Sequence, residues 1–295
     1  MLTILATSLT FSTPASAAPV TSPCPYETGA TQTWTKTSSG TAGEVVQTVQ
    51  LRVVSSTDAL VSFDVTTSLV RLDARDPVMA SITEALDAQS LAARVVLDRS
   101  SASLSLGNGA ALQAVYVAAG EQAVTALREA AAPQALLTLV PQLMADPDLM
   151  EQSVLRDLKP LLSMSCSTLD TGTSTYTTEL PSPFGEARLP ASGVLEVTAD
   201  AEALIVRNTE TIDAEALQAS AMEAMTGMAV QLEGATEADK AAALKLLGGV
   251  RFEAGTELVT ILDPVTGWAK DVSSTRTVRG PDQERLDRVR FTLAP

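Results

Sequence analysis

Apolar and polar residues alternate early in the chain, as they do in half-buried β-strands. The clearest alternation covers Thr31–Lys36, where Trp34 is the candidate for the core-facing position. Two longer runs rich in β-branched residues follow, Glu44–Val54 and Ala59–Leu72, with a short polar turn between them. We therefore expect a meander of three antiparallel strands.

The pattern then changes to a short helix and further short strands. Asp76 is the expected N-cap of this helix, since Asp is preferred there, and Pro77 would occupy the first helical position. Ile82 and Leu86 lie on the apolar face of this helix. The strands predicted after it are Ala93–Asp98, Ala102–Leu106 and, beyond a Gly107-Asn108-Gly109 turn, Ala111–Val117.

From residue 121 to residue 162 the spacing of apolar residues becomes helical. Four prolines divide this stretch into short segments, and Asp146-Pro147 is a helix start. Met150 and Leu158 belong to one apolar stripe on the segment that follows. We expect these helices to lie across a sheet face and to connect two lobes.

The rest of the chain repeats this order of elements. A helix capped by Asp213 is expected to run to about residue 232, and a second one to cover 237–247. The predicted strands around these helices are Ser174–Glu179, Gly193–Thr198, Ala203–Ile212, Glu257–Leu262, Trp268–Val278 and Leu286–Leu293.

Both halves also begin alike, which predicts an internal repeat. Cys24 and Trp34 in the first half correspond to Cys166 and Tyr176 in the second, and each pair is 142 residues apart (166 − 24 and 176 − 34). The predicted fold class is α+β, with two pseudo-repeated antiparallel β-β-β-α-β-β lobes and amphipathic helices on one sheet face. The expected division is a signal peptide (1–17), a first lobe (18–118), a helical connector (119–165) and a second lobe (166–295), with the lobes forming one continuous domain.

Several features predict an exported protein, periplasmic or extracellular. The first residues combine a short apolar run with a small-residue Ala15-Ser16-Ala17 site, which is typical of a signal peptide, although no basic residue precedes the run. An ordered first element is the alternative. Cys24 and Cys166 are the only cysteines, and in an exported chain they favour one disulfide over two free thiols. The net charge of −15 argues against nucleic acid and anionic membrane surfaces as partners.

The residue inventory also excludes several kinds of catalysis. The chain has no histidine, which removes His-dependent nucleophile systems and the usual zinc sites, and we expect no cofactor or metal. Asp170-Thr171-Gly172 resembles the active-site signature of pepsin-like aspartic peptidases, in which two carboxylates share a proton. The repeat places Glu27-Thr28-Gly29 opposite it, one methylene too long for a symmetric pair. The alternative is a turn that leads into a strand.

The predicted arrangement as a whole resembles the half-barrel envelope proteins, the class of periplasmic lipoprotein carriers and related secreted lipid-binding proteins. The resemblance rests on the strand order and on the Gly29–Trp34 and Gly172–Thr177 starts. It implies a non-enzymatic protein whose curved sheet holds an apolar ligand or lipid under helices. The residues expected to line such a cavity are Val65, Leu158, Met222, Met225, Met228 and Val259.

Three functions therefore remain open on the sequence alone. The first is this apolar-ligand binder. The second is a structural or partner-binding envelope protein with a filled core, in which the three methionines are ordinary core residues. The third is an acid peptidase.

Overall fold

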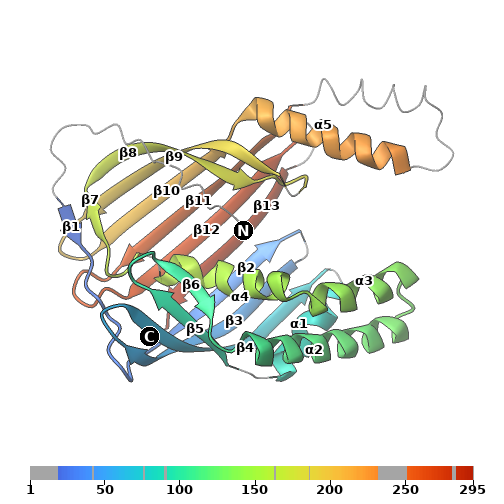
Figure 1. Ribbon diagram of the computed structural model, residues 1–295, viewed down its shortest axis with the longest axis horizontal. Coiled ribbons are helices and arrows are strands. Elements are labelled where there is room, and N and C mark those ends of the chain that lie inside the picture. Colours follow the sequence, from blue (N-terminus) through green and yellow to red (C-terminus); the bar gives the residue numbers. More distant parts are fainter. Residues whose placement is uncertain are drawn as a thin grey trace, which may run out of the picture.

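The protein is an α+β structure built on one large antiparallel sheet. Within the described residues, eleven strands form this sheet in the order β6-β5-β4-β3-β2-β13-β12-β11-β10-β9-β8, and β1 and β7 form a small second sheet (Figure 1). The proposed signal peptide, the Asp76 cap and the helix predicted over 237–247 lie outside the described residues. The computed structural model describes residues 19–41, 43–75, 77–89, 92–162, 164–185, 187–231, 251–280 and 284–294.

The meander predicted for the first half is confirmed, with longer strands than the alternation indicated. β2 continues into the predicted turn, and the chain returns at Gly43 with a φ of +127°. A Cβ atom on Gly43 would lie 2.1 Å from the carbonyl oxygen of Asp73, so this turn requires glycine. The strands are β2 (Thr31–Gly40), β3 (Gly43–Ser56), β4 (Leu60–Ala74), β5 (Ala93–Asp98) and β6 (Ser103–Leu106).

The predicted strands of the second half are also present. The turn after β11 is built around Asp263, whose Oδ1 accepts hydrogen bonds from the backbone N–H groups of Val265 (2.9 Å) and Thr266 (2.8 Å). Strands that follow one another in each half are neighbours in the sheet, and β2 pairs with β13 to join the halves. The strands are β8 (Gly172–Pro181), β9 (Arg188–Ala199), β10 (Leu204–Ile212), β11 (Glu253–Leu262), β12 (Ala269–Arg279) and β13 (Glu284–Leu293).

One predicted strand is wrong, because Ala111–Val117 belongs to a helix. Asn108 does not form a hairpin turn: its side-chain Oδ1 accepts the N–H of Arg94 (2.7 Å), while its carbonyl oxygen accepts the N–H of Leu112 (3.1 Å). The residue thus ends one strand pairing and opens a helix, and the alanine-rich sequence beyond it favours the helical state. The helices are α1 (Pro77–Gln89), α2 (Gly109–Glu129), α3 (Gln134–Ala145), α4 (Pro147–Leu162) and α5 (Ala214–Gln231).

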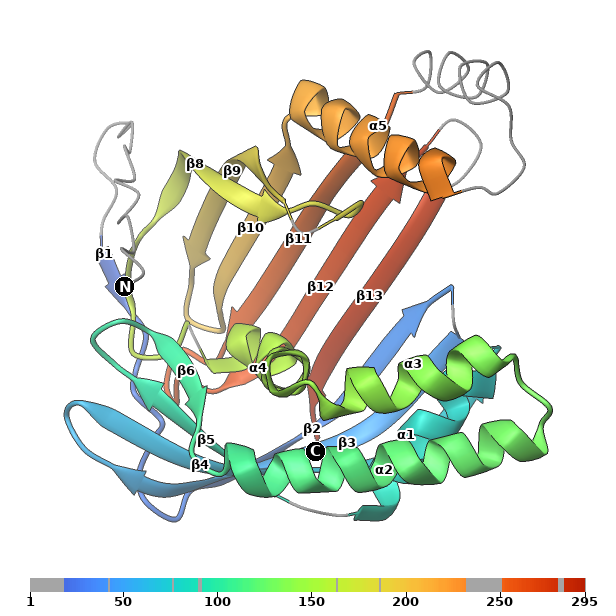
Figure 2. The same ribbon diagram turned by 45° about the vertical axis from the view of Figure 1, so that its right-hand side comes forward.

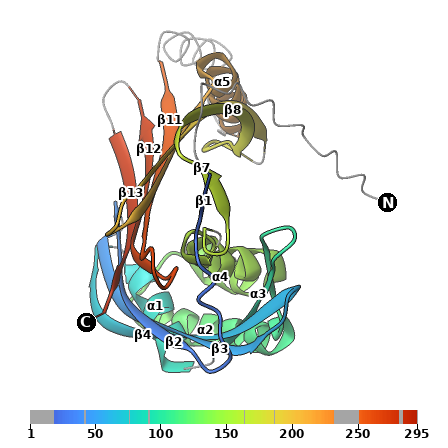
Figure 3. The same cartoon turned by 90° about the vertical axis from the view of Figure 1, so that its left-hand side faces the viewer.

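The large sheet is strongly bent, and α4 lies inside the bend (Figures 2 and 3). We call the sheet face that carries Trp34 and faces α4 the inner face. α4 contacts β5 and β6 at one side and β11 and β12 at the other, whereas α5 contacts β9 and β11. α1, α2 and α3 pack together beside β4. α4 and α5 therefore cover different parts of the second-half strands.

The main hydrophobic core lies between the inner face and α4. Leu158, Leu161 and Leu162 are the buried leucines of α4 in this core. Smaller apolar clusters form among α1, α2 and α3 and between α5 and the ends of β9, β10 and β11. The fully buried large side chains that the sheet contributes to the main core include Trp34, Leu51, Phe63, Val95, Leu262 and Phe291.

The predicted disulfide is confirmed and lies beside the small sheet. Cys24 and Cys166 are bonded with an S–S distance of 2.03 Å and a Cα–Cα distance of 4.5 Å. Next to it, β1 (Pro19–Thr21) pairs antiparallel with β7 (Thr168–Asp170), a pairing that the sequence did not predict. The start of the first half is thereby held against the start of the second.

A mostly buried ion pair links α4 to the inner face. Lys36 Nζ lies 2.6 Å from Asp157 Oδ2, and both side chains are about one-sixth exposed or less. Burial opposes the ionisation of Asp157, but the neighbouring Lys36 and Arg156 outweigh it and hold the pKa of this carboxyl below its usual range. The pair fixes the position of α4 across the strand that joins the two halves.

Replacing Lys36 should destabilise the protein because Asp157 would keep its charge without a partner. We expect Lys36→Met to lower the free energy of unfolding at neutral pH by about 3 kcal/mol. Since the folded-state pKa of Asp157 is depressed, its contribution is present above about pH 4 and is lost as the pH falls through the folded pKa. The difference between variant and wild type should therefore shrink in acid, which urea unfolding over a pH series measures.

The outer face offers a matched control for this ion pair. Arg207 and Glu257 are 3.7 Å apart, and both side chains are about half exposed. Arg207→Met should change the free energy of unfolding by less than about 1 kcal/mol. A Lys36→Met effect as small as this one would contradict the role given to the buried pair.

Candidate ligand-binding site

The structure does not bring the six predicted cavity residues together. Val65 and Leu158 both belong to the main core and are buried there. Val259 is on the opposite, outer face, because its neighbours Leu258 and Thr260 point inward. Met222 is half-buried on α5. Met225 and Met228 belong to the same helix, but their side chains lie outside what the structure describes.

A line of polar residues and one glycine crosses the inner face of the second half. The strand register places each member directly opposite the next, on six consecutive strands from β8 to β13. Adjacent strands are about 4.8 Å apart, so the line extends about 24 Å. We call it the inner polar row. Its members are Tyr176, Gly193, Glu210, Thr256, Arg276 and Asp287.

Hydrogen bonds join the first part of this row. The Tyr176 hydroxyl donates its one proton to Glu210 Oε1 at 2.8 Å and also lies 2.7 Å from the Asn208 side-chain amide. The Thr256 hydroxyl donates to Glu210 Oε2 at 3.1 Å. Burial and the bond to Glu210 raise the pKa of Tyr176, so the phenol stays protonated and remains a donor. A Cβ atom on Gly193 would meet the Tyr176 ring at 2.2 Å, and glycine therefore allows the ring to lie against β9.

Apolar residues border the inner polar row on both sides. Toward α4, the inner-face residues Leu195, Leu258 and Val289 are half-buried and pack against the main core. Toward α5, Ile212 and Ala254 are buried, and Val278 packs with them. The inner face thus changes from apolar to polar and back to apolar along the strands. Such a surface is suited to a molecule with both an apolar chain and a polar group.

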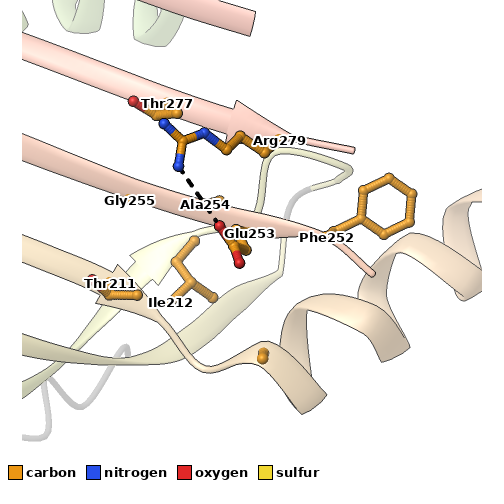
Figure 4. Close-up of a pocket in the computed structure, with 9 residues that line it drawn as sticks. Thr211, Ile212, Phe252, Glu253, Ala254, Gly255, Thr277 and Arg279 are labelled. Carbon is orange, nitrogen blue, oxygen red and sulfur yellow. Dashed lines mark ion pairs between the residues drawn. The ribbon is translucent and has the colours of Figure 1, made fainter. Parts of the chain in front are cut away.

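A pocket opens at the end of the sheet next to the apolar border under α5. It has a volume of about 370 Å³ and forms where β10 leads into α5. Ile212 and Phe252 are among its lining residues, and Glu253 faces Arg279 across it at 3.9 Å (Figure 4). The volume is within the range of small-molecule sites. Most of the lining (Thr211, Glu253, Gly255, Thr277 and Arg279) occupies outward positions of β10, β11 and β12. The pocket therefore lies mainly on the outer face and is separate from the inner polar row.

The two carboxylates of the peptidase-like motif are arranged differently from a catalytic pair. Asp170 lies in β7 opposite Pro19, and Glu27 lies in the loop before β2. Both residues are exposed, and no hydrogen bond joins them in the part of the chain that the structure describes. Gly29 and Gly172 have φ values of +90° and +112°, which are typical of turns. This geometry favours the alternative that both motifs are turns leading into strands.

Sequence reasoning identified no member of the inner polar row as a ligand residue. A partial signal exists in β10, where Asn208 and Glu210 occupy inward positions between buried Val206 and Ile212. The row as a whole depends on pairing between strands, and a single sequence does not reveal that register.

Other kinds of site find no support among the described residues. No cluster of three or more potential His, Cys, Asp or Glu metal ligands occurs in them. Across the same residues, no helix combines the length and the apolar character needed to cross a membrane.

No model of a protein family matches the chain, and no curated protein matches it.

Proposed function

We propose that the protein is an exported, non-enzymatic binder of an amphiphilic ligand such as a lipid, held along the inner face between α4 and α5. The observation that carries this proposal is the partly exposed inner polar row with apolar borders on both sides. A chain of the ligand would lie on Leu195, Leu258 and Val289. Its polar group would meet the row. The disulfide supports export because such bonds persist mainly outside the reducing cytosol.

The proposal includes a half-barrel formed by two related halves. In support, a helix follows the third strand of both halves, α1 after β4 and α5 after β10. Trp34 and Tyr176, which correspond in the repeat, both lie on the inner face, and the glycine before each has a positive φ. α4 contacts strands of both halves, and α5 contacts β9 and β11, so the ligand would lie on the part of the second-half inner face between these two helices.

Two neighbouring residues of β11 provide a sharp test of ligand binding. Leu258 points inward beside the row, whereas Val259 points outward. We expect Leu258→Glu to weaken the binding of a fluorescent long-chain fatty acid by at least about tenfold, because it places a charge where the chain would lie. Val259→Glu should leave affinity within about twofold. Fluorescence titration of the purified protein measures both.

Stability must be separated from binding in this experiment. Thermal unfolding of both variants, together with the milder Leu258→Ala, shows whether the fold is retained. Equal losses for Leu258→Glu and Val259→Glu, or no saturable binding by the wild type, would contradict the proposal.

A second candidate function, docking of a partner, is favoured by exposed leucines on α3 and α4. Leu139 is 45% exposed, Leu143 is 46% exposed and Leu149 is 41% exposed. Leu139 and Leu143 are four residues apart and therefore lie on the same side of α3. If this surface binds a partner, a Leu139→Glu/Leu143→Glu variant should lose that interaction and still bind the fatty acid. The two functions are separable in this way.

A further inference from the structure

Arg276 is the cationic member of the inner polar row. It lies on β12 between Thr256 and Asp287 in the register, and its side chain is exposed on the inner face. Among the described residues, no carboxylate lies within ion-pair distance of its guanidinium. An arginine so placed presents several N–H donors that are free to bind.

The two acidic members of the row are already engaged. Each oxygen of the Glu210 carboxylate accepts a hydrogen bond, one from Tyr176 and the other from Thr256. Asp287 pairs with Arg285, with Asp287 Oδ2 at 2.9 Å from Arg285 Nε. Contacts within the row and with Arg285 therefore engage its two carboxylates and leave the Arg276 guanidinium available.

The geometry points to a ligand whose polar group is an anion. We infer that the protein selects amphiphiles with a carboxylate or phosphate headgroup, an inference that rests on the proposed function. Arg276 binds the headgroup, and the apolar chain lies on the apolar residues that border the row. Guanidinium matches both anions through two parallel hydrogen bonds. Leu258 and Val289 are the apolar neighbours on the strands that flank Arg276, so chain and headgroup sites adjoin.

The test compares ligands that share a twelve-carbon chain and differ in the headgroup. Dodecanoate, dodecanol and dodecylamine would be titrated into the wild-type protein near pH 7, with acetate as the anion that lacks a chain. We expect dodecanoate to bind about tenfold more tightly than dodecanol. Acetate should neither bind measurably nor displace dodecanoate, which distinguishes an amphiphile site from a site for small free anions.

Arg276→Gln should weaken dodecanoate binding by about tenfold and so remove the preference for dodecanoate over dodecanol. Arg288→Gln is the matched control: Arg288 is also exposed and without an ion pair among the described residues, but it points to the outer face. Equal affinity of wild-type protein for dodecanoate and dodecanol, tighter binding of dodecylamine, or an equal loss in both variants would overturn the inference alone. If dodecanoate, dodecanol and dodecylamine all fail to bind, the proposed function would be overturned as well.

Discussion

Replacing both cysteines with serine should lower the free energy of unfolding by about 5 kcal/mol, the largest effect we expect. The bond joins Cys24 and Cys166 across a separation of 142 residues. A cross-link of this length removes much conformational freedom from the unfolded chain and so favours the folded state. Beside the bond, β1 and β7 pair over only three residues each. A sheet of this size is marginally stable without the cross-link.

Chemical denaturation of wild type and the Cys24→Ser/Cys166→Ser variant measures this loss. Wild-type protein with a dithiol reductant should unfold like the variant, and the variant should not respond to the reductant. A loss below about 1 kcal/mol would show that contacts between the halves, such as β2 with β13, suffice to hold them together.

Trp34→Ala should have the second largest effect, a loss of about 4 kcal/mol. The Trp34 side chain is 1% exposed, its Nε1 donates to the carbonyl oxygen of Ala269 at 2.8 Å, and its ring contacts Trp268 edge-on with centroids 5.9 Å apart. Truncation leaves a large cavity in the main core and an unpaired buried carbonyl. Because Ala269 belongs to β12, the contact also links the first half to the second.

Two further variants separate the contribution of the Trp34 hydrogen bond from that of its buried ring, and test whether the effect is specific to the inward position. Trp34→Phe keeps most of the ring but removes the hydrogen bond, and we expect it to cost about half as much as Trp34→Ala. Thr35→Ala alters the adjacent, exposed, outward position and should cost less than about 1 kcal/mol. Equal unfolding midpoints for the Trp34→Ala and Thr35→Ala variants would contradict the placement of Trp34 in the core.

The difference between predicted and observed elements has a common physical origin. Strands with clear alternation, such as the one around Trp34, were predicted because a sheet with one buried face imposes a period of two on its own residues. Ala111–Val117 was predicted wrongly because Gly107-Asn108-Gly109 is a strong local turn signal. The side chain and carbonyl of Asn108 instead bind different segments. That outcome depends on tertiary contacts that override a local preference.

The candidate site shows the same limit. Val259 and Leu258 are equally apolar and adjacent, and only the facing strands decide which of them points inward. Asp98 and Asp263, by contrast, each accept a backbone hydrogen bond from the turn that follows the strand. The N–H donors lie only two residues further along the chain, and such short-range contacts can be predicted from a sequence.

By itself, the sequence determined the α+β class, most of the strands and the pair of cysteines, because each depends on residues close together in the chain or on composition. Only the tertiary structure decided that β2 pairs with β13, that α4 fills one part of the bend, and that Tyr176, Glu210, Thr256 and Arg276 share one line. Those features depend on the register between strands from distant parts of the chain. Register is set by the packing of a whole face against its neighbours.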